Sequence, residues 1–153
     1  MNLIDLSIPI DSNTPVYPGD PISVFDHISR IEKDGWNEHR LTFNTHFGTH
    51  IDSPWHMISN GKRISDFHLT KFCGRGIVID VRGMEEIDVN IDCVSPDDIV
   101  LFWTDHILNA KSADFFQCAP VILPCLAEKL IEKKVKLIGI DSYKPRCFSF
   151  SCA

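Results

Sequence analysis

Residues 46–56 decide how this chain is interpreted, and they read His46-Phe47-Gly48-Thr49-His50-Ile51-Asp52-Ser53-Pro54-Trp55-His56. The histidines and the aspartate all occupy even positions. In an extended chain, side chains at even spacing project to the same face, whereas residues two apart in a helix point in nearly opposite directions. Gly48 and Pro54 also disfavour the interior of a helix. We therefore predict the end of a strand followed by a bent loop, with four polar side chains converging.

A divalent metal is the ligand that suits this set of groups best. Neutral imidazole nitrogens and an anionic oxygen are ordinary ligands for such an ion, and they leave room for water. Two other interpretations remain open: histidines that are merely solvated or hydrogen-bonded, and a structural zinc site. Structural zinc usually recruits a closed set of cysteines and histidines. The chain has six cysteines, but none lies in this segment and no C-x-x-C pair occurs, which favours an open catalytic site.

The composition is that of a globular protein with a single domain. The chain has 153 residues, 44% of them hydrophobic and 24% charged, which is enough to build a core. Its net charge of -6 speaks against a nucleic-acid surface, which would need a basic stripe. No stretch approaches the ~20 apolar residues of a membrane span, and the N-terminus lacks the features of a signal peptide. We therefore expect a cytoplasmic protein with reduced cysteines.

Hydrophobic periodicity predicts a helix packed on a mixed sheet, which is the α/β (mixed α+β) class. Apolar runs predict strands at residues 3–10, 22–31, 36–46, 76–81, 98–104 and 136–141. The third of these strands would present His46 on its polar face. Turns are expected at Asp34-Gly35 and Asn60-Gly61, and residues 62–73 are either a short helix or a loop. Pro124 opens the predicted helix, whose apolar stripe is Leu123, Leu126, Ala127, Leu130 and Ile131.

Several residues outside the motif have simpler predicted roles. Asp80 and Asp141 end buried strands, where a carboxylate either reaches a cleft or caps the strand end. Trp103 is expected to pack in the core. Four of the six cysteines are expected to be small buried hydrophobic residues, namely Cys73, Cys93, Cys118 and Cys125.

The segment 46–56 matches the pattern H-x-G-T-H-x-D-x-P-x-H at every fixed position, and the chain therefore resembles the cyclase-like metal-dependent hydrolases. This family contains bacterial kynurenine formamidase and isatin hydrolase. Weaker matches follow in the family's order: Asp5-Leu6-Ser7, Pro15-Val16-Tyr17-Pro18-Gly19-Asp20, residues 98–104 and Gly139-Ile140-Asp141-Ser142. The resemblance covers residues 3–142 and implies a swivelling β/β/α fold and a homodimer or homotetramer.

The resemblance also implies roles for individual residues. His46, His50 and Asp52 would be the ligands of a first metal, and Asp52 would also bridge to a second. His56 would be the catalytic residue that accepts and donates a proton, and Tyr17 would contact the substrate. Trp55 could add to an aromatic wall around an aryl substrate. Zinc is the expected cofactor and manganese the alternative, because imidazole and carboxylate accept both.

The end of the chain departs from the family pattern. Family members continue beyond the segment that matches residues 139–142, and that region supplies a histidine and a glutamate to the second metal. Here no histidine, aspartate or glutamate follows Asp141. We therefore expect a cyclase-like domain over residues 1–141 and a tail over residues 142–153 that is a truncation, a frameshifted end or a divergent cap.

Three functions are compatible with these features. The first is a metal-dependent hydrolase of a small amide, formamide or lactam, in which a metal acidifies water and polarises the carbonyl while His56 carries the proton. The second is a shortened family member that binds metal but has little or no catalytic activity. The third is a metal-free binding or scaffold module.

Overall fold

The computed structural model describes residues 2–112 and 114–143 of a chain that divides into two compact units. The first unit is Met1–Ile64 and the second is Ser65–Ala153. The boundary predicted between residues 141 and 142 stays a prediction, because residues 144–153 lie outside the described part. None of the helices in the described part has the length and apolar character that a membrane crossing requires.

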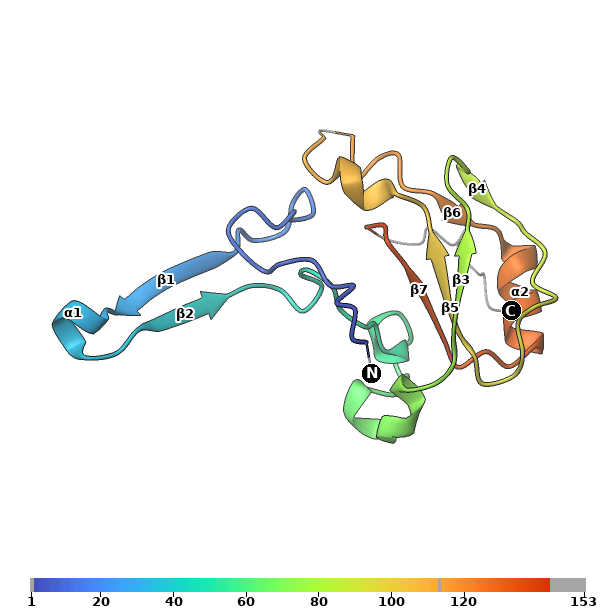
Figure 1. The fold of residues 1–153 in the computed structure, drawn as a ribbon, viewed down its shortest axis with the longest axis horizontal. Helices are drawn as coiled ribbons and strands as arrows, with labels where there is room; N and C mark the ends of the chain where they lie inside the picture. Colours follow the sequence, from blue (N-terminus) through green and yellow to red (C-terminus); the bar gives the residue numbers. More distant parts are fainter. Residues whose placement is uncertain (1, 113, 144–153) are drawn as a thin grey trace. The chain divides into compact units, whose positions relative to one another are not determined.

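A two-stranded ribbon is the regular part of the first unit (Figure 1). Strand β1 (Val24–Ser29) pairs antiparallel with strand β2 (Glu38–Thr42). The one-turn helix α1 (Ile31–Asp34) connects them, and Gly35 ends this helix with a φ of 84°. Glycine adopts this left-handed conformation without a steric penalty, so the predicted turn at Asp34-Gly35 is confirmed.

Side-chain pairs across the ribbon hold its strands together. The rings of His27 and His39 stack with their centroids 4.3 Å apart. Nη2 of Arg40 lies 2.7 Å from Oδ2 of Asp26 on the opposite strand. A two-stranded ribbon is marginally stable alone in water, so cross-strand pairs of this kind account for much of its cohesion.

Strand β2 is shorter than the predicted strand over residues 36–46. It ends at Thr42, which pairs with Val24, the first residue of β1. Before Val24 the chain contains Pro21 and several turns, and it forms no strand there. β2 therefore has no partner for backbone hydrogen bonds beyond Thr42. His46 therefore lies in the loop after the strand, and the prediction that the strand presents it was wrong.

The strand predicted over residues 3–10 is absent from the described structure, where residues 2–10 are irregular. Alternating apolar side chains define a face, but a strand also needs a neighbour for its backbone hydrogen bonds. Here the Ile8 amide donates to Oγ1 of Thr49, 3.0 Å away, rather than to a strand. Leu3, Ile4 and Leu6 are all exposed.

The second unit is built on a three-stranded parallel sheet in the order β3-β5-β7 (Figure 1). Its strands are β3 (Gly76–Asp80), β5 (Ile99–Trp103) and β7 (Leu137–Ile140). They confirm the predicted strands at 76–81, 98–104 and 136–141. A second parallel pair, β4 (Glu86–Ile87) with β6 (Val121–Ile122), was not predicted, because two-residue strands carry no periodicity.

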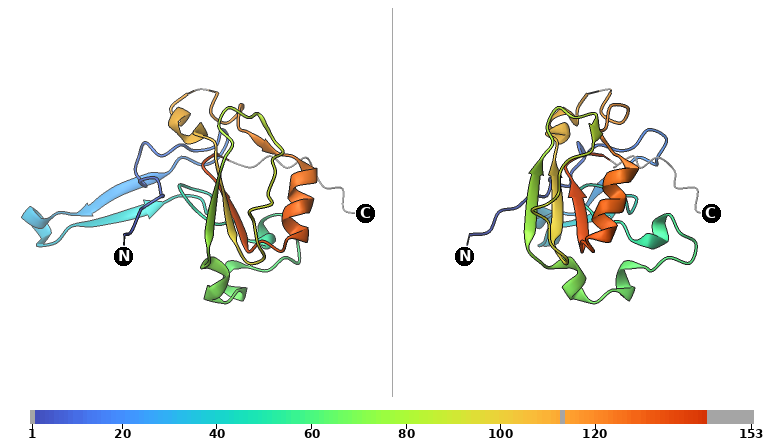
Figure 2. Two further views of the ribbon diagram at one scale, coloured as in Figure 1. Left: turned by 45° about the vertical axis from the view of Figure 1, so that its right-hand side comes forward. Right: turned by 90° about the vertical axis from the view of Figure 1, so that its right-hand side faces the viewer.

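Helix α2 (Pro124–Glu132) covers one face of this sheet (Figure 2). It begins at Pro124 as predicted, since proline at the first helical position needs no hydrogen-bond acceptor. Leu126 and Leu130 are buried with Val100 and Phe102 of β5 in the core, whereas Ile131 is 70% exposed. The predicted α/β class is confirmed, but the predicted mixed sheet is not, because the sheet under α2 is parallel and the antiparallel pair β1-β2 forms a separate sheet.

Short 3₁₀ helices make up most of the remaining regular structure. They are Pro54–His56, Ile64–Asp66, Leu69–Phe72 and His106–Asn109. The second and third of these resolve the ambiguity over residues 62–73. Asn60 and Gly61 form the predicted turn, in which the Gly61 amide donates to the Ile58 carbonyl.

Three predictions about residues outside the motif can be judged. The four cysteines at 73, 93, 118 and 125 are exposed, so their predicted burial was wrong; they occupy loops and the solvent side of α2. Trp103 is 40% exposed and lies under the guanidinium of Arg82 rather than in the core. Asp141 caps the strand ends, because its carboxylate accepts hydrogen bonds from Thr104 and from the Asp105 amide.

Candidate metal centre

A buried aromatic ring fixes the loop that carries the motif. Phe47 is 6% exposed, and its ring lies 5.1 Å from that of Phe43 and 6.1 Å from that of Phe25, measured between centroids. The loop bends at residues 45–46 and 48–49, and Phe47 is buried between these bends, whereas His46 beside it is exposed.

His46, His50 and Asp52 come together at this point of the loop. One potential ligand atom from each side chain lies within 4.8 Å of the others. Nδ1 of His46 is 2.7 Å from Oδ1 of Asp52, and Nε2 of His50 is 3.3 Å from the same oxygen. The two histidine nitrogens are 3.2 Å apart. Two imidazole nitrogens and one carboxylate oxygen therefore face a common point, and their exposure leaves that point open to solvent.

His56 approaches the cluster from the short helix Pro54–His56. Its ring centroid lies 3.9 Å from that of His46, with the ring planes tilted by 42°. The helix is held by a close backbone approach, because a Cβ on Gly61 would lie 2.5 Å from the carbonyl carbon of Pro54. The Trp55 amide also donates to the Lys62 carbonyl. Gly61 therefore helps to position His56. This role was not predicted from the sequence, although the turn at Asn60-Gly61 was.

Tyr17 and Trp55 are the two aromatic residues predicted to contact substrate. Tyr17 lies in the loop before β1 and is 45% exposed. Trp55 is 54% exposed, and the guanidinium carbon of Arg63 lies 4.9 Å from its ring centroid. This cation–π contact was not predicted. Both rings offer apolar surface to a ligand, and their role in substrate binding stays a prediction.

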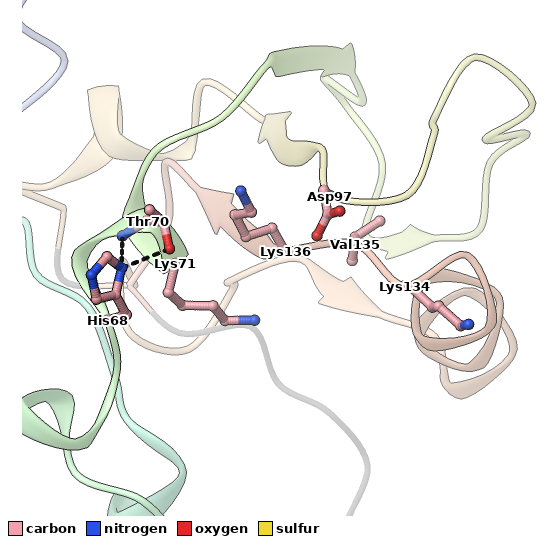
Figure 3. A pocket seen from close by; sticks show the side chains of 7 residues that line it. All are labelled: His68, Thr70, Lys71, Asp97, Lys134, Val135 and Lys136. Atoms are coloured by element: carbon pink, nitrogen blue, oxygen red, sulfur yellow. Dashed lines mark hydrogen bonds between the residues drawn. The ribbon is translucent and has the colours of Figure 1, made fainter.

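The second unit contains a separate hollow of about 490 Å³, lined by His68, Thr70, Lys71, Asp97, Lys134, Val135 and Lys136 (Figure 3). Its ammonium groups point in different directions in Figure 3. Lys136 already donates to the Cys73 carbonyl, and the His68 imidazole caps its own helix at the Thr70 amide. These groups do not converge on one point, so the hollow lacks the geometry of the histidine–aspartate cluster.

The sequence pattern of the family described as "Putative cyclase" matches residues 4–145 of this chain. Similar proteins include a kynurenine formamidase of Bacillus cereus strain ATCC 14579, 32% identical over 143 residues. Another is a kynurenine formamidase of Geobacillus thermodenitrificans strain NG80-2, 34% identical over 146 residues. Each match covers 90% of this chain and 67% of the relative. The chain therefore belongs to the cyclase family, as the motif predicted.

Solved structures share the fold. A potential metal-dependent hydrolase with cyclase activity has a TM-score of 0.77 at 24% identity, covering 96% of this chain and 71% of the other. An isatin hydrolase bound to the product analogue thioisatinate has a TM-score of 0.74 at 19% identity, covering 93% and 67%. These likenesses confirm the predicted cyclase-like fold.

Proposed function

We propose that this chain is a metal-dependent hydrolase that cleaves the C–N bond of a small amide, formamide or lactam. The observation that carries the proposal is the convergence of His46, His50 and Asp52 within 4.8 Å. The family membership supports it, and so do the names of the similar proteins, which include a kynurenine formamidase and an isatin hydrolase.

The donor set fits a divalent cation of the zinc or manganese type. Imidazole nitrogen suits zinc, carboxylate oxygen suits both metals, and three protein ligands leave a position open for water or substrate. The Gly48 carbonyl lies 2.8 Å from Nδ1 of His50, so Nε2 is left free to act as a ligand. When bound, such a cation supplies Lewis acidity and lowers the pKa of water toward ~7.

The chain's own residues would do the remaining work. His56 stands beside His46, where its imidazole could accept a proton from water and return it to the departing nitrogen. Hydrolysis then balances, because the hydroxyl of water joins the carbonyl carbon while its proton goes to the nitrogen. Tyr17 and Trp55 would supply apolar faces for an aryl group on the substrate.

Purified protein, stripped of metal and reloaded with zinc or manganese, tests this proposal directly. N-formylkynurenine and isatin are suitable substrates, because they represent a formamide and a lactam. We expect turnover by the loaded protein and none by the stripped protein or by His50→Ala. Stoichiometric metal without turnover on a panel of amides and lactams would favour a metal-binding family member with little activity. No bound metal would overturn the proposal.

A further inference from the structure

We propose that Gly48 is a positioning residue for His50, and that Ile10 holds Gly48 in the conformation that this role requires. The consequence for metal affinity rests on the proposed function, because it takes His50 as a ligand. The consequence for the imidazole itself does not, because it can be measured in metal-free protein.

The backbone of Gly48 is left-handed, with a φ of 67°. A residue with a Cβ adopts this conformation only at a steric cost, whereas glycine does so freely. The left-handed turn directs the Gly48 carbonyl back toward the ring of His50, and the oxygen lies 2.8 Å from Nδ1. The conformation of one residue thus sets the hydrogen-bond partner of the other.

This hydrogen bond determines which ring nitrogen can bind a cation. A carbonyl oxygen can only accept, so Nδ1 of His50 must carry the hydrogen, and in the neutral ring Nε2 then carries the lone pair. Nε2 is also the atom that faces the other two ligands, 3.3 Å from Oδ1 of Asp52 and 3.2 Å from Nδ1 of His46. The opposite tautomer would direct an N–H at the metal position.

Ile10 packs where a side chain on residue 48 would lie. A Cβ built on Gly48 would be 3.0 Å from Cγ1 of Ile10 and 3.4 Å from its Cδ1. The segment around Ile10 is tied in place by two hydrogen bonds: the Ile8 amide donates to Thr49, and the Thr14 hydroxyl donates to the Pro9 carbonyl. The N-terminal segment therefore supports the motif loop, although it forms no strand.

Two other glycines of the same unit provide matched controls. Gly19 and Gly35 also have positive φ values, of 98° and 84°. A Cβ on either would meet nothing within 4 Å. Alanine at these positions reproduces the backbone strain of Gly48→Ala without the contact to Ile10 and without affecting the carbonyl that faces His50.

The first experiment is long-range ¹H–¹⁵N NMR of the histidine rings in metal-free wild-type protein at about pH 8, above the ordinary pKa of imidazole, about 6.5. The His50 signals are assigned by their loss in His50→Gln. We expect His50 to be protonated at Nδ1 and unprotonated at Nε2. A predominant Nε2–H tautomer would overturn the proposal, and this result requires neither a variant that folds nor a metal that binds.

The second experiment measures zinc affinity by competition with a chromophoric chelator. We expect Gly48→Ala to bind zinc about 10–100-fold more weakly than wild type, the usual effect of losing an outer hydrogen-bond partner of a ligand. Gly19→Ala and Gly35→Ala should stay near wild type. Equal affinity in all three variants would overturn the proposal. If Gly48→Ala fails to fold, Ile10→Ala takes its place, with exposed Leu6→Ala as its control.

The two experiments separate this proposal from the proposed function. If wild-type protein binds no zinc, the metal-dependent function fails, while the NMR result still decides whether His50 carries its hydrogen on Nδ1, the nitrogen that faces the Gly48 carbonyl. If zinc binds but the tautomer is the opposite one, the function stands and the role of Gly48 fails.

Discussion

Nδ1 of His46 lies 2.7 Å from Oδ1 of Asp52. His50 is the third member of this cluster of potential metal ligands. Phe47, the neighbour of His46, is buried and anchors the loop after the end of β2, while His46 itself is exposed. A loop anchored by one apolar side chain thus gathers three potential ligands in solvent-accessible positions.

Removal of one cluster member should weaken metal binding strongly. We expect Asp52→Asn to lower zinc affinity by more than about 100-fold, because an anionic ligand is removed outright. Loss of a residue that only hydrogen-bonds to a ligand costs up to about 100-fold. Isothermal titration calorimetry of the metal-free protein with zinc measures this affinity. Asp97→Asn is the matched control, since asparagine tolerates its left-handed φ of 66°. Equal zinc binding by both variants would contradict the assignment of Asp52.

His56 should affect turnover rather than metal content. We expect His56→Ala to retain zinc while kcat falls by about 10²–10⁴, the range for loss of a general acid–base residue. The pH profile of kcat/KM should also lose one of its limbs. Ile22→Ala, which changes a side chain of the same unit that is 84% exposed, should leave kcat unchanged. A His56→Ala enzyme with wild-type kcat would remove this residue from the mechanism.

Acid should lower the free energy of unfolding of the second unit, because it protonates Asp98. Both carboxylate oxygens of Asp98 accept hydrogen bonds from Arg75, and this partner, with the Ser95 amide, lowers the pKa of Asp98 to about 2. The folded state therefore binds fewer protons than the unfolded state between pH about 4 and about 2. The stabilisation is complete above that interval and is lost as the pH falls through it.

Urea denaturation from pH 7 down to pH 2 checks this dependence. Asp98→Asn should be less stable than wild type at pH 7, and the difference should shrink below pH about 4 as the native carboxylate is protonated. A stability difference between the two proteins that stays constant from pH 7 to pH 2 would show that the charge of Asp98 does not cause the loss of stability. Asp80, whose pKa Arg82 also lowers to about 2, should contribute less because its side chain is half exposed.

Two leucine-sized positions on α2 should differ sharply in their effect on stability. Leu126 is fully buried in the core, so Leu126→Ala should lower the free energy of unfolding by about 2–5 kcal/mol. Ile131→Ala on the exposed side of the same helix should stay within about 0.5 kcal/mol of wild type. Chemical denaturation measures both values. Similar losses in the two variants would mean that α2 does not pack on the sheet through Leu126.

Local patterns predicted the second unit well and the first unit less well, for physical reasons. The strands β3, β5 and β7 and the proline-initiated helix α2 are defined by their own side chains, so periodicity identified them, although β3 and β7 are not fully buried, since Val78 and Ile138 are exposed. Residues 3–10 have an equally regular alternation, but a strand depends on a partner that the local sequence does not specify. The end of β2 was misplaced for the same reason, since it is set by where β1 begins.

The candidate site was likewise predicted only in part. Even spacing and the glycine and proline of the motif predicted that His46, His50 and Asp52 would converge, and the structure brings them together. The supporting roles of Gly48 and Gly61 depend on contacts to Ile10 and Pro54, which spacing alone does not reveal. The expected cytoplasmic location and homo-oligomeric state stay predictions.

X-ray absorption spectroscopy of the zinc-loaded protein tests the central claim most directly, because it identifies the atoms around the metal. The account predicts two imidazole nitrogens at about 2.0–2.1 Å with oxygen ligands completing the shell, and loss of one imidazole in His50→Ala. Sulfur scattering at about 2.3 Å from cysteines, or a spectrum unchanged by His50→Ala, would contradict it.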